Sequence, residues 1–270
     1  MLPWLETIGI FILADIGVLI GLLTTRLKKP LWLLGYIVPL FLIIIIALPR
    51  HIYWLVFYPP FSWLNAGRRE YVIFAFAIPM IFSTLIPRMP KLIQKVALTL
   101  FVTVVSVIFF VIPFISPILI RHDLENIKTE FSYDGMCIQS TDYTCGPASA
   151  VIALYQLGIE ASEGELAILA YTTPQTGTSD DLLAKAIEKK YGPEGIICTY
   201  RHFKSVAELK ANCPAIVVTK YSFLVDHYVT VIKVSNRKVV IGNPSYGREI
   251  LTYEEFKKRW RSVGIVLRKR

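Results

Sequence analysis

The segment Gln139-Ser-Thr-Asp-Tyr-Thr-Cys145-Gly146-Pro147-Ala148 places a cysteine six residues after a glutamine, at the expected start of a helix. Pro147 suits the first helical turn, apolar residues recur over 151–157, and Gly158 supplies a stop. A thiol at this end of a helix lies near the positive pole, which favours the reactive thiolate. The Gln139 amide and the Cys145 backbone N–H are candidate donors to an oxyanion. The alternative is a small buried cysteine that only packs.

The composition of the 270-residue chain changes sharply near residue 120. Residues 1–120 carry nine Lys or Arg and three acids between long apolar runs, whereas residues 121–270 carry twenty bases and seventeen acids. Most of the net charge of +9 therefore lies in the first part, where bases beside membrane segments are ordinary. The second part has no basic stripe interleaved with aromatic residues, so nucleic acid is not an expected partner.

Residues 1–120 are predicted to form an all-α transmembrane region, because each apolar run approaches the ~20 residues that a bilayer requires. The four predicted helices are at about 6–25, 31–49, 70–87 and 95–120. Segment 51–64 is rich in Trp and Tyr, is broken by two prolines and is too short to cross, so we expect it to be interfacial or re-entrant. The lipid bilayer is thus an expected partner of a multi-pass protein in a bacterial-type cell membrane.

The first predicted span contains two features of note. Asp15 indicates either a functional path or a protonated or interhelically hydrogen-bonded carboxyl group. Gly17-xxx-Gly21 is a candidate helix-packing face. The first apolar run is not preceded by a basic region, so no cleavable signal peptide is expected.

Four spans place the amino terminus and the second part on the same side of the membrane. The first and third loops hold six bases and the other side holds five, which favours an extracytoplasmic second part by a margin of one. This margin leaves the side of the membrane open.

After a linker at 121–134, residues 135–270 are predicted to form an α+β domain. Helices are expected from Pro147 to the stop at Gly158, near 162–171, after Gly177-Thr178-Ser179-Asp180-Asp181 through Lys190, at 205–211 and at 253–261. Strands are expected at 195–201, 214–220, 227–234, 238–241 and 264–267. Helices that precede mostly antiparallel strands are typical of an α+β layout.

A nucleophilic cysteine needs a base, and the base needs a third group that orients it. His227 opens the strand His-Tyr-Val-Thr-Val-Ile, which is a rigid mount for a base. The paired strand ends at Asn243, so its amide is expected near the same end of the hairpin. Asp226 is the weaker orienting residue, because successive strand side chains point to opposite faces. Considered alone, His227 is more often a polar residue whose hydrogen bonds are satisfied, and Asn243-Pro244 is typical of a turn.

The remaining histidines are poorer candidates. His51 and His122 belong to the membrane part or its edge, and His202 lies at the end of a strand beside Arg201.

The four cysteines, Cys137, Cys145, Cys198 and Cys213, are not at zinc-like spacing and form no CxxC motif. No metal and no cofactor is therefore expected. Their even number permits a disulfide, which the sequence leaves unassigned.

Together, Gln139-x5-Cys145-Gly146, Gly177-Thr178-Ser179, His227-Tyr-Val and Asn243-Pro244 resemble the C39 peptidases, which are papain-like cysteine peptidases that cleave after double-glycine leaders. The resemblance covers about residues 135–267. It implies that Cys145 is the nucleophile, His227 the general base and acid, Asn243 the orienting residue and Gln139 the oxyanion donor. The family often has Asp where this chain has Asn243. An amide orients the ring but stabilises imidazolium less, which favours lower activity.

The context of the motif departs from the family. Many members are the amino-terminal domain of an ABC exporter, whereas here the motif follows four helices and no Gly-x4-Gly-Lys-Ser/Thr phosphate loop is present. ATP-driven export by this chain is therefore not expected, and a separate exporter or another membrane protein is a candidate partner.

The sequence thus predicts an α+β papain-like cysteine peptidase domain after a transmembrane region of about four helices. The expected reaction is hydrolysis of a peptide bond in a peptide or protein substrate, with cleavage after Gly-Gly as an extrapolation. Two rivals stay open. One is a non-catalytic module that binds leader-like peptides, and the other is a transamidase, deamidase or acyltransferase on the same fold.

Overall fold

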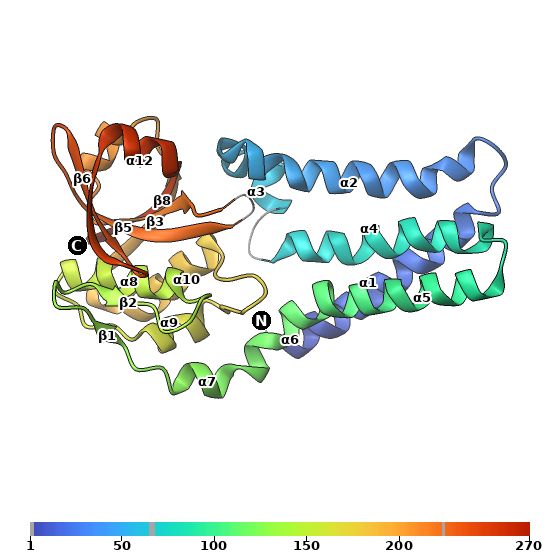
Figure 1. Cartoon of the computed structure of the whole chain (residues 1–270), viewed down its shortest axis with the longest axis horizontal. Helices are drawn as coiled ribbons and strands as arrows, with labels where there is room; N and C mark the ends of the chain where they lie inside the picture. The colour runs from blue at the N-terminus through green and yellow to red at the C-terminus, as the bar shows by residue number, and fades with distance from the viewer. Residues whose placement is uncertain (1–2, 65–67, 223–224) are drawn as a thin grey trace. The chain divides into compact units, whose positions relative to one another are not determined.

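The structure, a computed structural model, describes residues 3–64, 68–222 and 225–270. The chain forms two compact units, which divide between Ile118 and Leu119 (Figure 1). Each unit is described by itself.

The first unit is all-helical. Its elements are α1 (Pro3–Thr24), η1 (Leu31–Leu33), α2 (Leu34–His51), η2 (Tyr53–Phe57), α3 (Phe61–Leu64), α4 (Arg69–Leu85), η3 (Ile86–Arg88), α5 (Leu92–Ser106), η4 (Val107–Val111) and α6 (Ile112–Leu119). Within the described residues, four helical stretches are long and apolar enough to cross a membrane, at Trp4–Thr24, Leu31–Pro49, Arg69–Arg88 and Leu92–Leu119. The prediction of four long apolar helices is confirmed.

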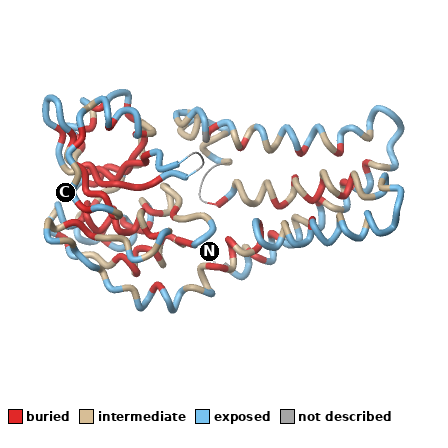
Figure 2. Tube along the Cα trace, viewed as in Figure 1, coloured by how far each residue is buried: buried red, intermediate tan, exposed pale blue. Residues whose placement is uncertain are grey.

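Much of the backbone of the first unit belongs to exposed residues (Figure 2). Many of these residues are large and apolar, such as Leu92 at 77% and Ile93 at 74% exposed. Exposed apolar surface on this scale indicates contact with a membrane or a partner. Segment 51–64 forms the 3-10 helix η2 and the single turn α3, both much shorter than a membrane span.

Helices α1 and α4 pack closely through the predicted glycine face. A Cβ added at Gly17 would lie 2.4 Å from Phe76 O, and one at Gly21 would lie 2.5 Å from Met80 O. Small residues allow helix backbones to approach in this way. Asp15 is exposed on α1, so its carboxyl group does not point into this interface.

The second unit contains both helices and strands. Its helices are α7 (Arg121–Glu125), α8 (Cys145–Gln156), α9 (Glu163–Leu169), α10 (Asp180–Tyr191), η5 (Gly192–Glu194), α11 (Val206–Lys210) and α12 (Tyr253–Arg259). Its strands are β1 (Glu130–Phe131), β2 (Cys137–Ile138), β3 (Ile196–His202), β4 (Ala215–Lys220), β5 (Asp226–Val234), β6 (Lys238–Asn243), β7 (Gly247–Thr252) and β8 (Trp260–Lys269).

The expected linker at 121–134 differs from the observed structure, because it folds as part of the second unit. It holds α7 and β1, and Leu124 of α7 is only 2% exposed. A Cβ at Gly164 would lie 2.1 Å from Leu124 O, so α7 packs tightly on α9. Burial of Leu124 holds this segment against α9, a contact that the length and polarity of the segment did not indicate.

The main sheet has six antiparallel strands in the order β3-β8-β4-β5-β6-β7. The strand β7 was not predicted, and the predicted strand 264–267 is part of the ten-residue β8. Strand β7 lies at the edge of the sheet, and only Gly247 and Leu251 of its residues are fully buried. Its alternation of apolar and polar residues is therefore weak. The hairpin between β6 and β7 is closed by the pair Asn243↔Gly247, where Gly247 has φ +84°.

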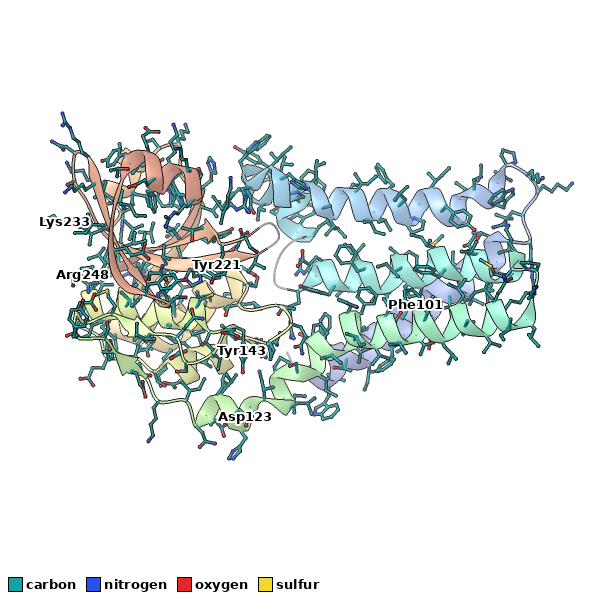
Figure 3. The ribbon with its side chains drawn as sticks, in the orientation of Figure 1. Phe101, Asp123, Tyr143, Tyr221, Lys233 and Arg248 are labelled. Carbon is teal, nitrogen blue, oxygen red and sulfur yellow. The ribbon has the colours of Figure 1, made fainter. Side chains whose placement is uncertain are left out.

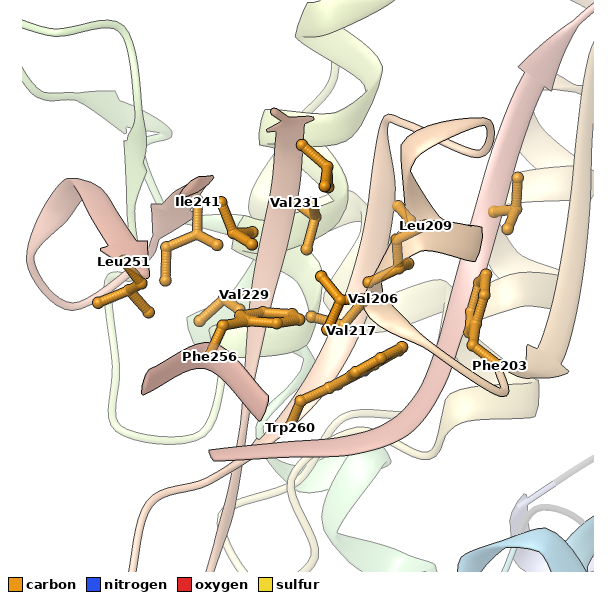
Figure 4. Packing of buried hydrophobic residues seen from close by; sticks show 14 residues of the cluster. Phe203, Val206, Leu209, Val217, Val229, Val231, Ile241, Leu251, Phe256 and Trp260 are labelled. Carbon is orange, nitrogen blue, oxygen red and sulfur yellow. The ribbon is translucent and has the colours of Figure 1, made fainter. Parts of the chain in front are cut away.

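The two faces of the sheet bury different elements. On one face lies α8, where Thr230 Oγ1 of β5 donates to Ser149 O at 2.6 Å and a Cβ at Gly242 of β6 would lie 2.9 Å from Ile152. The other face carries an apolar cluster beneath α11 and α12 (Figure 4). This cluster includes Val206, Leu209, Val217, Val229, Val231, Ile241, Leu251, Phe256 and Trp260. The second unit is therefore an α+β domain, as predicted.

Candidate active site

Cys145 is the first residue of α8, and the loop before it is closed by hydrogen bonds between Thr141 and Thr144. The Thr141 N–H donates to Thr144 Oγ1 at 3.1 Å, and the Thr144 N–H donates to Thr141 O at 3.3 Å. A Cβ at Gly146 would lie 3.0 Å from Thr178 Cβ, so glycine permits a close approach there. This loop sets Cys145 at the amino-terminal end of a buried helix.

Burial raises the pKa of the Cys145 thiol above its ordinary value of 9.0, and the backbone N–H groups of Tyr228, Gly146 and Cys145 itself oppose that rise. The N–H groups at the helix end favour the thiolate in the predicted direction, but desolvation outweighs them in the resting site. Tyr228, whose backbone interacts with the Cys145 thiol, belongs to β5 and directly follows His227.

His227 and Asn243 meet on one face of the sheet. The register Thr230↔Gly242, continued by one residue, sets Val229 opposite Asn243, and His227 lies two residues before Val229. Residues in this diagonal relation point to the same face and are within reach of each other. His227 Nε2 lies 2.9 Å from Asn243 Oδ1, and the two residues are only 8% and 7% exposed. A carbonyl oxygen only accepts, so Nε2 carries a proton and Nδ1 of the neutral ring has a free lone pair.

Asn243 has two further partners. The Ser245 N–H donates to Asn243 Oδ1 at 3.0 Å, and Asn243 Nδ2 donates to Glu249 Oε1. Glu249 lies opposite Ile241 in the β6–β7 register, so it is again a diagonal neighbour of Asn243 on the same face. Its second oxygen, Oε2, is 3.7 Å from Arg259 Nη1. The hydrogen bonds therefore continue from β5 through β6 to β7.

Gln139 directly follows β2 and is bound to the turn after β6. Its N–H donates to Pro244 O at 2.9 Å, its Oε1 accepts from Ser245 Oγ at 3.3 Å, and its Nε2 donates to Thr141 O at 2.9 Å. Ser245 also binds Asn243, so one residue connects the two amides. The amide nitrogen of Gln139 has a second hydrogen besides the one directed at Thr141.

Burial lowers the pKa of His227 below its ordinary value of 6.5, while the hydrogen bond to Asn243 and the charge of Glu249 oppose the decrease. The His227 ring centroid lies 5.6 Å from that of Tyr221. Tyr221 follows β4 and is labelled in Figure 3. A hollow of about 210 Å³ adjoins the ring. Its lining is Thr219, Lys220, Tyr221, His227, Val229, Ile241, Asn243, Tyr246, Glu249, Leu251, Phe256 and Arg259.

Tyr228 and Asp180 form a polar contact on the α8 side of the sheet that the sequence analysis missed. The Tyr228 hydroxyl lies 2.6 Å from Asp180 Oδ1 and 3.0 Å from Thr178 O, and the Tyr200 hydroxyl donates to Asp180 Oδ2 at 3.0 Å. Burial raises the pKa of Asp180 to about 6, and the two tyrosine hydroxyls oppose the rise. This contact ties the strand that carries His227 to the amino-terminal end of α10.

Glu163 is a second residue that the sequence analysis missed. It is fully buried, and its carboxylate accepts from the Ser140 N–H and from Ser140 Oγ, both at 2.8 Å. Its own N–H donates to Thr129 Oγ1 at 2.9 Å. Glu163 thus holds the residue next to Gln139. No local sequence signal indicates this contact, because the two residues are far apart in the chain.

The remaining histidines and acids lie elsewhere. His202 is at the end of β3, which β8 and β4 separate from β5. His122 lies on α7, where Asn126 Nδ2 is 3.3 Å from its Nε2. Asp226 is ion-paired with Arg261 at 2.8 Å.

All four cysteines are free thiols. Burial raises the pKa of Cys137 to about 12, of Cys198 to about 12 and of Cys213 to about 11, with smaller contributions from neighbouring groups. These three cysteines are therefore neutral thiols at ordinary pH.

Hydrogen bonds join His227, Asn243, Ser245 and Gln139. The backbone of Tyr228, the residue after His227, interacts with the Cys145 thiol. With the pKa of the thiol raised and that of the imidazole lowered, both groups are uncharged at neutral pH. A thiol and a neutral imidazole are the groups that acyl-transfer chemistry requires, because the imidazole accepts the thiol proton when the sulfur attacks a carbonyl carbon.

Residues 135–270 match the profile of the Peptidase C39 family. An uncharacterised protein of Methanothermobacter marburgensis is 32% identical over 120 residues, which are 44% of this chain and 78% of that protein. An uncharacterised protein of Methanothermobacter thermautotrophicus is 29% identical over 132 residues, which are 49% of this chain and 87% of that protein.

Two solved structures are similar to the second unit. A double glycine motif protease from an AMS/PCAT transporter, in complex with the leader peptide, is 16% identical, with coverage of 53% of this chain and 93% of that one and a TM-score of 0.43. The peptidase domain of Streptococcus ComA, a bifunctional ABC transporter involved in a quorum sensing pathway, is 24% identical, with coverage of 49% and 96% and a TM-score of 0.43.

Proposed function

The chain belongs to the Peptidase C39 family, and from this premise we propose that it is a membrane-anchored cysteine peptidase. The proposed substrate is a peptide or protein, and a bond that follows a Gly-Gly pair is the first cleavage site to test. Cys145 is the proposed nucleophile, His227 the general base and acid, Asn243 the orienting residue and Gln139 an oxyanion donor.

In the first half of the proposed reaction, the thiol proton of Cys145 passes to Nδ1 of His227 as the sulfur attacks the scissile carbonyl carbon. The carbonyl oxygen becomes an oxyanion, which the second Nε2 hydrogen of Gln139 and a backbone N–H stabilise. The imidazolium then gives its proton to the leaving amine. The carbon–nitrogen bond breaks, and the acyl group remains on sulfur as a thioester.

In the second half, His227 takes a proton from water, and the resulting hydroxide attacks the thioester. The carbon–sulfur bond breaks, the sulfur recovers a proton from the imidazolium, and a carboxylic acid leaves. No cofactor is needed, because every proton removed from one group is returned to another.

The observation that carries this proposal is the 2.9 Å contact between His227 Nε2 and Asn243 Oδ1. It fixes the ring tautomer so that Nδ1 is free to accept a proton. The backbone of Tyr228, the residue after His227, interacts with the Cys145 thiol, and this supports a sulfur near the strand that carries the ring.

Membrane anchoring is the second element of the proposal, and the four long apolar helices support it. An anchor of this kind raises the effective concentration of the enzyme near substrates at the same membrane. Fractionation of cells that produce the full chain, with extraction by alkaline carbonate and by detergent, tests the anchoring separately from catalysis.

The test of catalysis is labelling of the full chain, in detergent micelles, by an activity-based electrophile that carries a peptide ending in Gly-Gly. We expect labelling at Cys145 alone, as located by mass spectrometry of the digested protein. The other three cysteines serve as internal controls, because their thiols are also neutral at ordinary pH and the proposal gives none of them a base. The proposal fails if wild-type protein labels no more than the Cys145→Ala variant.

A second measurement separates peptidase from transferase chemistry. Peptides incubated with the protein are analysed by mass spectrometry, where hydrolysis gives a free carboxylate and transfer gives a product joined to an added amine. Transfer products without hydrolysis would contradict the peptidase assignment, but they would still be consistent with Cys145 as the nucleophile.

A further inference from the structure

One polar side chain on each of three neighbouring strands forms a continuous hydrogen-bonded series. His227 on β5 binds Asn243 on β6, and Asn243 binds Glu249 on β7. Each pair is in the diagonal register of adjacent antiparallel strands, so the three side chains occupy the same face of the sheet. Glu249 is the carboxylate at the far end of this series from the ring.

The partners of Asn243 determine which way its amide faces. The Ser245 N–H can only donate and lies 3.0 Å from Oδ1, whereas the carboxylate of Glu249 accepts from Nδ2. Rotation of the amide by 180° would set Nδ2 against the Ser245 N–H and Oδ1 against the carboxylate. Both contacts would then be repulsive. Glu249 and Ser245 together therefore keep the oxygen of Asn243 directed at His227.

Glu249 also places a negative charge behind a neutral amide. An asparagine by itself orients an imidazole but contributes no charge to an imidazolium. The carboxylate of Glu249 favours the protonated ring, since its charge raises the pKa of His227 and so opposes the effect of burial. Arg259 lies 3.7 Å from the carboxylate and is partly exposed, so it reduces this effect without cancelling the hydrogen bond.

Other charged and titratable groups face the same ring or the hollow beside it. Lys220 and Tyr221 come from β4 and its end, Tyr246 from the β6–β7 turn, Glu249 from β7 and Arg259 from α12. Cys145 of α8 lies at the backbone of Tyr228, and Asp226 is bound to Arg261. Among these described groups, Glu249 is the carboxylate that is connected to the ring by hydrogen bonds, through the side chain of Asn243.

We infer that Glu249 is a positioning residue of the site, which locks the Asn243 amide toward His227 and supplies the negative charge that an orienting aspartate would otherwise bring. Asn243 thus orients the ring and Glu249 supplies the charge, two roles that a single aspartate would combine. The inference rests on the proposed roles of Cys145 and His227.

The test uses iodoacetamide, because alkylation of a thiol requires no knowledge of the substrate. The full chain in detergent micelles is alkylated over a series of pH values, and the rate at Cys145 is followed by mass spectrometry of the peptide that contains it. In the wild type, the rate should rise through an acid limb set by the His227 pKa, stay at a plateau near neutral pH, and rise again only as the pH approaches the raised pKa of the thiol.

The Glu249→Gln variant keeps an oxygen that accepts from Asn243 Nδ2 but removes the charge. We expect the plateau rate at Cys145 to fall by about tenfold and the acid limb to move to lower pH, which corresponds to a decrease of about one in the pKa of the ring. Glu249→Ala also removes the acceptor, so its rate should be lower still. Glu254→Gln changes the same charge at an exposed position of α12 and should match the wild type.

A rescue variant separates the inferred role from simple damage to the fold. In the Glu249→Gln background, Asn243→Asp puts a carboxylate directly beside the ring, and the plateau rate and acid limb should return to wild-type values or exceed them. With Glu249 present, Asn243→Asp sets two carboxylates together, which raises the pKa of one of them, so the gain should be smaller.

The outcomes distinguish this inference from the proposed function. If Glu249→Gln has the wild-type profile, or lowers the rate equally at every pH without moving the limb, Glu249 does not position the site. If Asn243→Asp fails to restore a Glu249→Gln protein that still unfolds at the wild-type temperature, the inferred division of roles is wrong. If instead the wild-type rate at Cys145 is unchanged by His227→Ala, the proposed Cys145–His227 pair itself fails.

Discussion

Nε2 of His227 lies 2.9 Å from Oδ1 of Asn243, across two neighbouring antiparallel strands. This contact is buried and holds the ring in the tautomer whose Nδ1 is free. We expect Asn243→Ala to lower the rate of Cys145 labelling by about 10–100-fold, less than the ~10⁴ seen when a triad carboxylate is altered, because an amide carries no charge. The measurement is the labelling rate at pH 7, with unchanged far-ultraviolet circular dichroism as the control for folding.

Gln139 has one amide hydrogen directed at Thr141 and a second available to an oxyanion. Gln139→Ala should lower kcat for a cleaved peptide by about 10²–10³, with a much smaller change in KM, because the donor acts only where charge develops. Gln139→Glu keeps the shape but cannot donate from an ionised carboxylate, so it should be equally slow. An effect confined to KM would assign Gln139 to substrate binding.

The pH dependence of the reaction follows from the pKa values of the resting pair. His227 must be neutral to accept the thiol proton, and its pKa lies below 6.5. Activity is therefore lost only as the pH falls through that lowered pKa, and the acid limb of kcat/KM should lie below pH 6.5. An acid limb above pH 7 would contradict the buried environment of the ring. Profiles of kcat/KM from pH 4 to 9 provide the measurement.

Tyr228 supports Asp180 with a charge-assisted hydrogen bond. Tyr228→Phe should lower the free energy of unfolding by about 1–3 kcal/mol at pH 7.5, where the carboxylate is ionised and loses a donor. The pKa of Asp180 is raised to about 6, so folding favours its protonated form. The cost of the substitution should therefore decrease as the pH falls from 7.5 to 5. Urea unfolding of the full chain at both pH values checks the sign, and a cost that grows at pH 5 would contradict it.

The first unit offers a matched pair of glycines on α1. A Cβ at Gly17 would lie 2.4 Å from Phe76 O, whereas a Cβ at Gly9 meets nothing within 4 Å. Gly17→Ala should destabilise the first unit by about 1–3 kcal/mol through steric overlap with α4. Gly9→Ala should be neutral or stabilise by up to about 1 kcal/mol. Unfolding in mixed micelles titrated with sodium dodecyl sulfate compares the two, and equal stabilities would contradict the packing.

Much of the fold was predictable from local patterns. The four apolar helices of the first unit and the helix that starts at Cys145 follow from long apolar runs and from Pro147 and Gly158, which act within a few residues of themselves. The edge strand β7 was not predicted, because one of its faces is exposed and its apolar alternation is weak. The placement of α7 was also missed, because it depends on burial of Leu124 against residues far along the chain.

The division into an apolar helical part and an α+β part could be predicted from the amino-acid sequence, as could the order of the candidate residues Gln139, Cys145, His227 and Asn243. These properties reside in composition and in short-range spacing. The pKa shifts of the candidate residues and the hydrogen bonds that hold Asn243 depend on the tertiary structure. Desolvation raises the pKa of Cys145 and lowers that of His227, and the register of three strands brings Glu249 behind Asn243. Burial and strand register depend on contacts between distant residues, so no local pattern contains them.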